Sequence, residues 1–231
     1  MYIIRIFLIV IVAVVTAIVT IVTWPLHFNG RLPYFYYKIM AKLFLLCGGV
    51  KVDYVHGLEN LDKNETYLFL SNHLSYFDIP VLMNVLPNNI RFVYKKSMTK
   101  IPIFGWGMYA GGYIPINRTN PREAIVSLKK AADYIVRKRL SVVMFPEGTR
   151  SPDGNTAEFK RGMTMIAELA KCKIVPVSIS GTYEILNRSS LKIKPGKVRV
   201  YIDKPVEYSA ERNFLSGLRD LIVANKEKLN V

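Results

Sequence analysis

The sequence has few of the residues that build disulfide frameworks and metal sites. Its 231 residues include two cysteines, Cys47 and Cys172, and three histidines, His27, His56 and His73. Two cysteines give no disulfide framework, which favours a reducing compartment, and three scattered histidines argue against a metal cluster. The chain also lacks zinc-finger spacings and a Gly-x-Ser-x-Gly nucleophile elbow. What remains is a chain long enough to bury a full core.

Acidic residues are scarce, and the first 50 residues contain none. The chain has 32 Lys and Arg against 17 Asp and Glu, which gives a formal net charge of +15. A surface with this charge attracts nucleic acid, anionic lipid or phosphorylated substrates. No basic helix is interleaved with base-stacking aromatics, and the apolar N-terminus favours the membrane. We therefore expect anionic membrane lipid as a partner and no nucleic acid.

Residues 6–24 form a long apolar run without a single charge. Such a run can span a bilayer, which needs about 20 residues. A cleaved signal peptide is the alternative, but the run is too long and lacks a small-x-small site before Trp24-Pro25. We expect either one true membrane span or one arm of a helical hairpin embedded in the membrane.

Residues 34–49 are apolar and aromatic around most of a helical circumference, with Lys38 and Lys42 one turn apart. The pattern suits a helix at the lipid–water boundary, with snorkelling lysines and tyrosines at headgroup depth. It suits a core-packing helix equally well. We expect residues 1–49 to form a two-helix membrane anchor and residues 50–231 an α/β domain on the cytoplasmic face.

From residue 50 onward, short apolar runs alternate with helical patterns, which predicts an α/β sheet with helical cover. Strands are expected at 50–55, 66–71, 90–94, 112–116, 141–145, 174–179 and 198–202. Helices are expected at 76–86, 121–139, 161–171 and 210–228. The helix at 121 has the clearest start, because Asn120 can cap it, Pro121 suits its first position and Glu123 completes a capping box.

A histidine and an aspartate follow the second expected strand, in the stretch SNHLSYFDIP at 71–80. Asp78 could be a helix-capping residue, with Ser75 as the N-cap in a Ser-x-x-Asp box. That interpretation leaves His73 unexplained. In the catalytic interpretation, a turn brings Asp78 against the imidazole. The carboxylate then holds one ring nitrogen protonated and leaves the other as a base.

Cationic residues follow three further strand ends. Arg150 lies in VVMFPEGTRS, Arg118 lies in GGYIPINRTN, and Lys95 and Lys96 come directly after residues 90–94. Ligands of open α/β sheets bind outside the carboxyl ends of strands, and the arginine fork suits a phosphate. A salt-bridged surface loop would explain any one of these cations alone. Three together favour an anion site.

These stretches form four blocks that resemble the glycerolipid acyltransferases, most closely the 1-acylglycerol-3-phosphate acyltransferases. In chain order the blocks are Asn72-His73-x-Ser75-x-x-Asp78, Gly112-x-Ile114-x-Ile116-x-Arg118, Phe145-Pro146-Glu147-Gly148-Thr149-Arg150 and Val175-Pro176-Val177. They span residues 72–177 with family-like spacing, although Asn117 stands where the family often has an acidic residue. The resemblance implies a glycerol-3-phosphate acyltransferase-like fold, with a mixed, largely parallel sheet behind an N-terminal membrane-associated helical hairpin.

The resemblance also implies a reaction: acyl transfer from acyl-CoA or acyl carrier protein to the sn-2 hydroxyl of lysophosphatidate, giving phosphatidate without a cofactor or metal. It makes His73 the general base and Asp78 the residue that orients it. The implied substrate-binding residues are Arg118, Glu147, Gly148, Thr149 and Arg150, with Lys95 as a further phosphate contact. The segment Val175-Pro176-Val177 would line the acyl site.

Two alternatives stay open. One is an acyltransferase of the same superfamily that acts on glycerol 3-phosphate or on another lysophospholipid. The other is a non-catalytic membrane protein that binds anionic lipid, which would explain the charge and the anchor but not the histidine–aspartate block or FPEGTR. A covalent acyl-enzyme is disfavoured, because neither cysteine lies near the motif histidine in sequence.

Overall fold

The computed structural model describes residues 2–27, 31–160, 162 and 164–229, and its strands form one seven-stranded sheet. The strands are β1 (Val50–His56), β2 (Leu68–Ser71), β3 (Ile90–Lys95), β4 (Ile114–Ile116), β5 (Ser141–Met144), β6 (Ile174–Ser180) and β7 (Gly196–Ile202). Their order is β1-β7-β6-β2-β5-β3-β4, and every neighbouring pair is parallel except β6 with β7. The predicted mixed, largely parallel sheet is confirmed, and each predicted strand is present.

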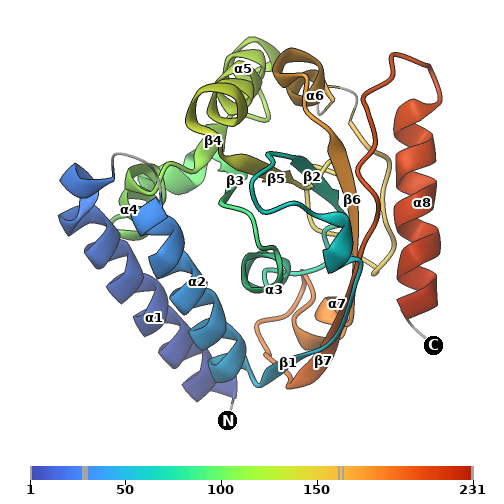
Figure 1. The fold of residues 1–231 in the computed structure, drawn as a ribbon. Helices are drawn as coiled ribbons and strands as arrows, with labels where there is room; N and C mark the ends of the chain where they lie inside the picture. The colour runs from blue at the N-terminus through green and yellow to red at the C-terminus, as the bar shows by residue number, and fades with distance from the viewer. Residues whose placement is uncertain (1, 28–30, 161, 163, 230–231) are drawn as a thin grey trace.

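Helices cover both faces of the sheet (Figure 1). One face packs against α2 (Arg31–Gly48) and α3 (Asp78–Val85) in a core that includes Phe69, Val143 and Val175. The other packs against α5 (Pro121–Lys138), α6 (Met165–Ala170) and α8 (Phe214–Leu229) in a second core. The four predicted helices are therefore present, with later starts at α3, α6 and α8. Residues 161 and 163 of the predicted third helix lie outside the described residues.

The start of α5 follows the sequence prediction. The Asn120 side chain accepts hydrogen bonds from the backbone N–H groups of Arg122 and Glu123, and Pro121 occupies the first turn. Glu123 departs from the predicted capping box in one detail, because its carboxylate accepts from the side-chain amide of Asn120 at 3.2 Å. The remaining short elements were not predicted: α4 (Phe104–Ala110), α7 (Thr182–Ile185), and the 3₁₀ turns η1 (Trp24–Leu26), η2 (Leu58–Asn60) and η3 (Lys96–Lys100).

Helix α4 escapes prediction because its sequence, FGWGMYA, contains two glycines, which disfavour a helix. Packing explains why they are there. A Cβ atom on Gly107 would lie 2.6 Å from the Cβ atom of Ala17 on helix α1 (Tyr2–Val22). The glycine lets α1 and α4 approach each other closely, and this contact attaches α1 to the domain.

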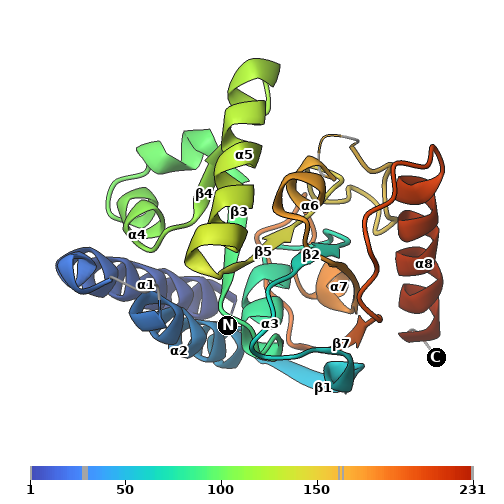
Figure 2. The same cartoon turned by 45° about the horizontal axis from the view of Figure 1, so that its top comes forward.

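The first two helices pack against each other and lie across the molecule from α8, as Figure 2 shows. Among the described helices, α1 alone is long and apolar enough to cross a membrane, and little of it is buried. Helix α2 has two faces. Tyr37, Ala41 and Leu45 are buried in the core, whereas a second set is exposed: Phe35, Ile39, Leu43 and Leu46. The core-packing interpretation therefore holds for one face of α2.

Lys38 does not snorkel toward headgroups as its pattern suggested. Its Nζ donates to the carbonyls of Asn84 and Leu86 at 3.1 and 2.8 Å, next to the C-terminus of α3. Burial lowers the pKa of this ammonium group to about 8, and the nearby charge of Lys42 acts in the same direction. The physical reason is that the last carbonyls of α3 lack partners within the helix and attract a cation.

Candidate active site

The carboxyl ends of five strands meet at one edge of the sheet, because β4, β3, β5, β2 and β6 are mutually parallel. His73 follows β2, the FPEGTR stretch follows β5, and Arg118 follows β4. Lys95 ends β3, and Thr182 follows β6. The sheet thus gathers at one edge the candidate residues that the sequence spreads over more than 100 positions.

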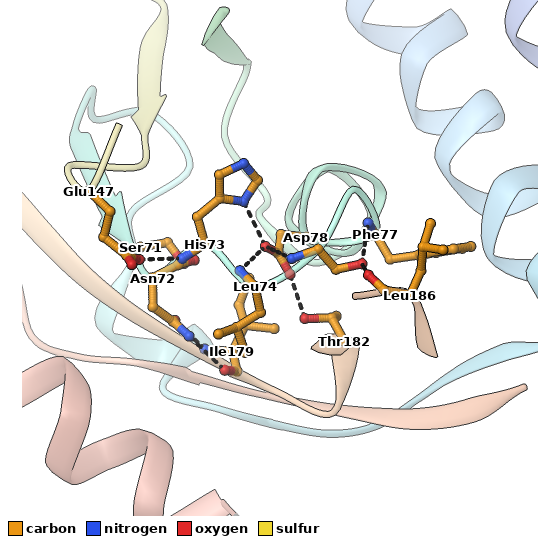
Figure 3. A network of polar contacts seen from close by, with 11 residues as sticks. Ser71, Asn72, His73, Leu74, Phe77, Asp78, Glu147, Ile179, Thr182 and Leu186 are labelled. Carbon is orange, nitrogen blue, oxygen red and sulfur yellow. Dashed lines mark hydrogen bonds and ion pairs between the residues drawn. The ribbon is translucent and has the colours of Figure 1, made fainter. Parts of the chain in front are cut away.

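His73 and Asp78 form the pair that the catalytic interpretation requires (Figure 3). The imidazole Nδ1 lies 2.8 Å from Asp78 Oδ2, and the side chains are 13% and 0% exposed. Oδ2 also accepts the backbone N–H groups of Leu74 and Ser75, at 2.7 and 2.8 Å. Oδ1 accepts the Thr182 hydroxyl at 2.5 Å. Four donors around one buried carboxyl group match the ionised form, which only accepts.

This arrangement fixes the tautomer of His73. Because Asp78 only accepts, Nδ1 carries the proton, and Nε2 keeps a lone pair. Among the described residues, Nε2 has no hydrogen-bond partner. The ring also stacks on Phe145, with centroids 3.9 Å apart and planes 12° apart. Held on two sides, the imidazole presents Nε2 as a base.

Asp78 also makes the contacts of the capping interpretation, although the helix starts later than predicted. Helix α3 begins at Asp78 itself, two residues later than predicted, and its N-cap residue Phe77 makes no side-chain capping bond. The bonds of the predicted box are nevertheless present, because the Ser75 hydroxyl accepts from Phe77 N–H at 3.2 Å and Asp78 Oδ2 accepts from Ser75 N–H at 2.8 Å. The same hydroxyl donates to the Leu186 carbonyl at 2.7 Å, which ties the turn to the end of α7.

Backbone contacts hold the histidine turn against the loop that follows β5. Glu147 Oε1 accepts the His73 N–H at 2.7 Å, and Oε2 accepts the Ala157 N–H at 2.9 Å. Ser151 N–H donates to the His73 carbonyl at 2.7 Å. Asn72 makes two bonds to the backbone of Ile179, which fixes the end of β2 against β6. His73 is thus held at both its N–H and its C=O.

Glu147 is an unusual carboxyl group in this network. Its side chain is almost fully buried, and burial raises its pKa to about 7. The N–H groups of Ala157 and His73 oppose this shift, and the charge of Asp78 adds to it. The structure places both carboxylate oxygens on backbone N–H groups. Glu147 therefore orders the loop that carries His73.

Two arginines lie on loops that leave the same edge of the sheet. Arg118 donates to the carbonyl of Gly148, whose φ of +76° favours glycine at that position. The Arg150 guanidinium lies 3.6 Å from the centroid of the Tyr76 ring, in the histidine turn. A cavity of about 220 Å³ opens beside Phe145 and is lined by Arg118, Gly148 and Lys160, among others. Burial lowers the pKa of Arg118.

Lys160 is the site residue that the sequence analysis missed. Its Nζ lies 2.9 Å from the position that a Cβ atom would take on Gly148. The residue sits in an irregular loop, far along the chain from any strand end, so the strand-end rule could not find it. Its backbone N–H bonds to the Pro146 carbonyl at 3.0 Å, and this bond folds the loop back over the FPEGTR stretch.

Other predicted residues lie apart from the cavity. Lys95 and Thr149 are exposed. Val175, Pro176 and Val177 are fully buried in β6, between β2 and β7, and are not among the residues that line the cavity. Their role in the acyl site stays a prediction. Within the described residues, no group of three or more His, Cys, Asp or Glu side chains could hold a metal ion.

Known proteins resemble this chain over the region that holds these residues. The acyltransferase family model matches residues 53–180, which include all four motif blocks. The chain is 38% identical to a chloroplastic 1-acyl-sn-glycerol-3-phosphate acyltransferase of Brassica napus, over 70% of this chain and 46% of that protein. It is 30% identical to a protein of the same name from Limnanthes alba, over 90% of this chain and 74% of that one.

A solved structure has the same fold. The 1-acyl-sn-glycerophosphate acyltransferase PlsC from Thermotoga maritima matches with a TM-score of 0.82 at 24% identity, over 100% of this chain and 96% of that one. The chloroplastic relatives are longer, and the match spans less than half the length of the Brassica napus protein.

Proposed function

The chain belongs to the acyltransferase family, and from that premise we propose that it transfers an acyl group from a thioester to the sn-2 hydroxyl of 1-acylglycerol 3-phosphate, forming phosphatidate. One observation carries the proposal. A histidine whose tautomer is fixed by a buried aspartate lies at the same sheet edge as three cations, Arg118, Arg150 and Lys160. A base beside a phosphate-binding group is what acylation of a phosphorylated alcohol requires.

The proposed mechanism uses His73 twice. Its Nε2 takes the hydroxyl proton while the acceptor oxygen attacks the thioester carbonyl and forms the new C–O bond. The resulting imidazolium is stabilised by Asp78, which stays ionised. When the tetrahedral intermediate collapses, the C–S bond breaks, and the imidazolium returns its proton to the leaving thiolate. No covalent acyl-enzyme and no cofactor is needed, because the thioester is already activated.

Positioning supplies the rest of the catalysis. Arg118, Arg150 and Lys160 bind the acceptor phosphate, which directs the hydroxyl toward Nε2. Thr149 and Lys95 lie exposed near the same edge and add weaker contacts. Glu147 acts by holding the His73 backbone rather than by touching the substrate. The segment Val175-Pro176-Val177 would act on the acyl site indirectly, because it is buried in β6 and does not line the cavity.

The apolar helix α1 is consistent with membrane association. A diacyl product does not dissolve in water, so the reaction belongs at a bilayer surface. We propose that residues 1–49 form the membrane-associated part and that residues 50–231 form the catalytic domain on the cytoplasmic face. Anionic lipid would strengthen membrane binding by about 1 kcal/mol for each Lys or Arg close to the membrane surface. Deletion of residues 1–24 should lower activity on bilayers more than activity on detergent-dispersed substrate. If the deletion lowers activity by the same factor in both assays, this division is contradicted.

Thiol release tests the reaction itself. The purified full chain is given acyl-CoA or acyl carrier protein as the donor, and lysophosphatidate, glycerol 3-phosphate or lysophosphatidylcholine as the acceptor. We expect free thiol and phosphatidate in equal amounts, and only when lysophosphatidate is present. A preference for glycerol 3-phosphate or lysophosphatidylcholine would establish the neighbouring activity instead. Binding of lysophosphatidate without thiol release from either donor would support the non-catalytic alternative.

A further inference from the structure

A second cationic cleft lies at the opposite end of the sheet. It has a volume of about 1240 Å³ and is lined by the beginnings of β3 and β5, the ends of α4 and α5, and residues around η1 and the start of α2. Arg91 and Ser141, which line it, stand at the amino ends of their strands. His73 follows the carboxyl end of β2, so the length of the sheet separates the two sites.

Positive charge dominates the cleft. Its lining contains six cationic residues and one acidic residue, Glu65; the cations are Lys63, Arg91, Lys130, Arg137, Lys138 and Arg139. Arg137 pairs with Asp133 at 3.3 Å. Lys130 and Lys138 take part in none of the ion pairs of the described residues. The cleft therefore retains a strong attraction for an anion.

Aromatic rings hold these ammonium groups at the wall of the cleft. Lys130 Nζ lies 5.7 and 5.8 Å from the ring centroids of Tyr109 and Tyr134, and Lys138 Nζ lies 4.7 Å from that of Tyr134. Cation–π contacts of this kind orient a charge without neutralising it. Arg91, only 1% exposed, contributes a further guanidinium to the lining.

The cleft adjoins exposed apolar surface. Trp24 and Tyr109 line it and are 59% and 55% exposed, and Trp106 is equally exposed one turn before Tyr109 on α4. The outer side chains of α1, which packs on α4, continue this apolar surface. Aromatics and cations beside an apolar helix have the composition of a lipid–water boundary.

We propose that this cleft binds the phosphate headgroup of an anionic glycerophospholipid, at a site separate from the catalytic one. The headgroup phosphate lies between Lys130 and Lys138, and the acyl chains follow the apolar surface of α1 and α4. Among the described lining residues the one histidine, His27, is not free to act as a base, because its ring nitrogens contact Ala110 O at 3.2 Å and Thr23 Oγ1 at 3.1 Å. The bound lipid would hold the enzyme on anionic bilayers in one orientation.

Trp24 provides a reporter, because the chain has two tryptophans and Trp106→Phe leaves only the one in the cleft. The full chain in neutral detergent is titrated with dihexanoyl phosphatidylglycerol, and Trp24 emission is followed. We expect a saturable change. The Lys130→Gln/Lys138→Gln variant should raise the half-saturating concentration roughly 30-fold, because each cation lost near the lipid should weaken binding about fivefold.

The matched control is Lys129→Gln/Lys204→Gln, which removes the same charge from two exposed lysines outside the cleft. Its half-saturating concentration should stay close to that of the unsubstituted background, and Lys130→Arg/Lys138→Arg should retain binding. An equal loss in both glutamine variants would overturn the proposal in favour of a diffuse surface field. If inorganic phosphate saturates the signal at the same concentration, the cleft does not recognise a lipid. If dihexanoyl phosphatidylcholine does so, the cleft does not require a net negative charge.

Turnover in the same micelles separates this site from the catalytic one. At saturating lysophosphatidate, Lys130→Gln/Lys138→Gln should retain the activity of the background. Selective loss of turnover in that variant, with an unchanged circular dichroism spectrum, would place the cleft in the reaction and contradict a separate site. Because binding is read from Trp24, the result stands even if the proposed acyl acceptor proves wrong.

Discussion

The turn after β2 and the loop after β5 leave the same edge of the sheet, but they present opposite kinds of side chain. The turn holds its carboxylate out of water, with four donors around Asp78 and a single ring nitrogen of His73 left over. The loop buries its acid, Glu147, in backbone contacts and leaves Arg150 partly exposed on Tyr76. From this difference we propose that the turn carries proton transfer and the loop carries charge recognition.

The largest expected effect comes from the turn. His73→Ala should lower turnover by about 10²–10⁴-fold, the usual contribution of a general base. The fold should persist, because the backbone groups of residue 73 keep their bonds to Glu147 and Ser151. Steady-state thiol release measures the change. His56→Ala, at a histidine on β1, is the control and should keep normal turnover. If His73→Ala keeps more than about a third of that rate, His73 is not the base.

Substitution of the arginines should instead weaken binding of the acceptor. Arg118→Ala and Arg150→Ala each remove a charged partner of the acceptor phosphate, which costs about 1.5–3 kcal/mol, or roughly 10- to 150-fold in affinity. The Michaelis constant for lysophosphatidate should rise, while that for the acyl donor changes little. Lysine should rescue only part of the loss, because it lacks the fork. Arg212→Ala is the surface control. Equal increases for donor and acceptor would contradict the assignment.

The loop's own acid makes a prediction about stability. The folded chain raises the pKa of Glu147 to about 7, so the folded state holds its proton more tightly than the unfolded state does. The resulting stabilisation of the folded state is fully present below about pH 4.5 and is lost as the pH rises through 7. Over that pH interval, the free energy of unfolding of the parent should fall by at most about 3 kcal/mol relative to that of Glu147→Gln, as measured by denaturant unfolding. Parallel curves for the two proteins would show that burial does not raise this pKa.

The smallest effect tests the cation–π contact between the two segments. The Tyr76 ring supports the Arg150 guanidinium, and an exposed cation–π contact contributes about 0.5–1 kcal/mol. Tyr76→Leu should therefore raise the Michaelis constant for lysophosphatidate about two- to fivefold at unchanged turnover, whereas Tyr76→Phe should match the parent. A fall in turnover with Tyr76→Leu would mean that Tyr76 positions His73.

Much of this architecture was predictable because its signals are local. Runs such as residues 66–71 and 174–179 are rich in β-branched and aromatic residues, and parallel strands bring the residues after their carboxyl ends to one edge of the sheet. The pairing of His73 with Asp78 was predictable for the same reason, because five positions and one turn connect the two residues.

The supporting contacts were not predictable, because they come from distant parts of the chain. Thr182 reaches Asp78 across 104 positions, and Glu147 reaches His73 across 74. Lys160 depends on how an irregular loop folds back over Gly148. Lys38 looked like a lipid-facing residue, because apolar composition alone does not distinguish a helix face that meets lipid from one that meets a neighbouring helix.

Separation of binding from chemistry is tested most directly by two quantities measured in two variants. For His73→Ala and Arg150→Ala, one measures the dissociation constant for lysophosphatidate and the single-turnover rate of acyl transfer with the acceptor saturating. We predict that His73→Ala loses at least about 100-fold in rate with nearly unchanged affinity, and that Arg150→Ala loses at least about tenfold in affinity with nearly unchanged rate. If both variants lose rate and affinity in the same proportion, the turn and the loop do not have separate roles.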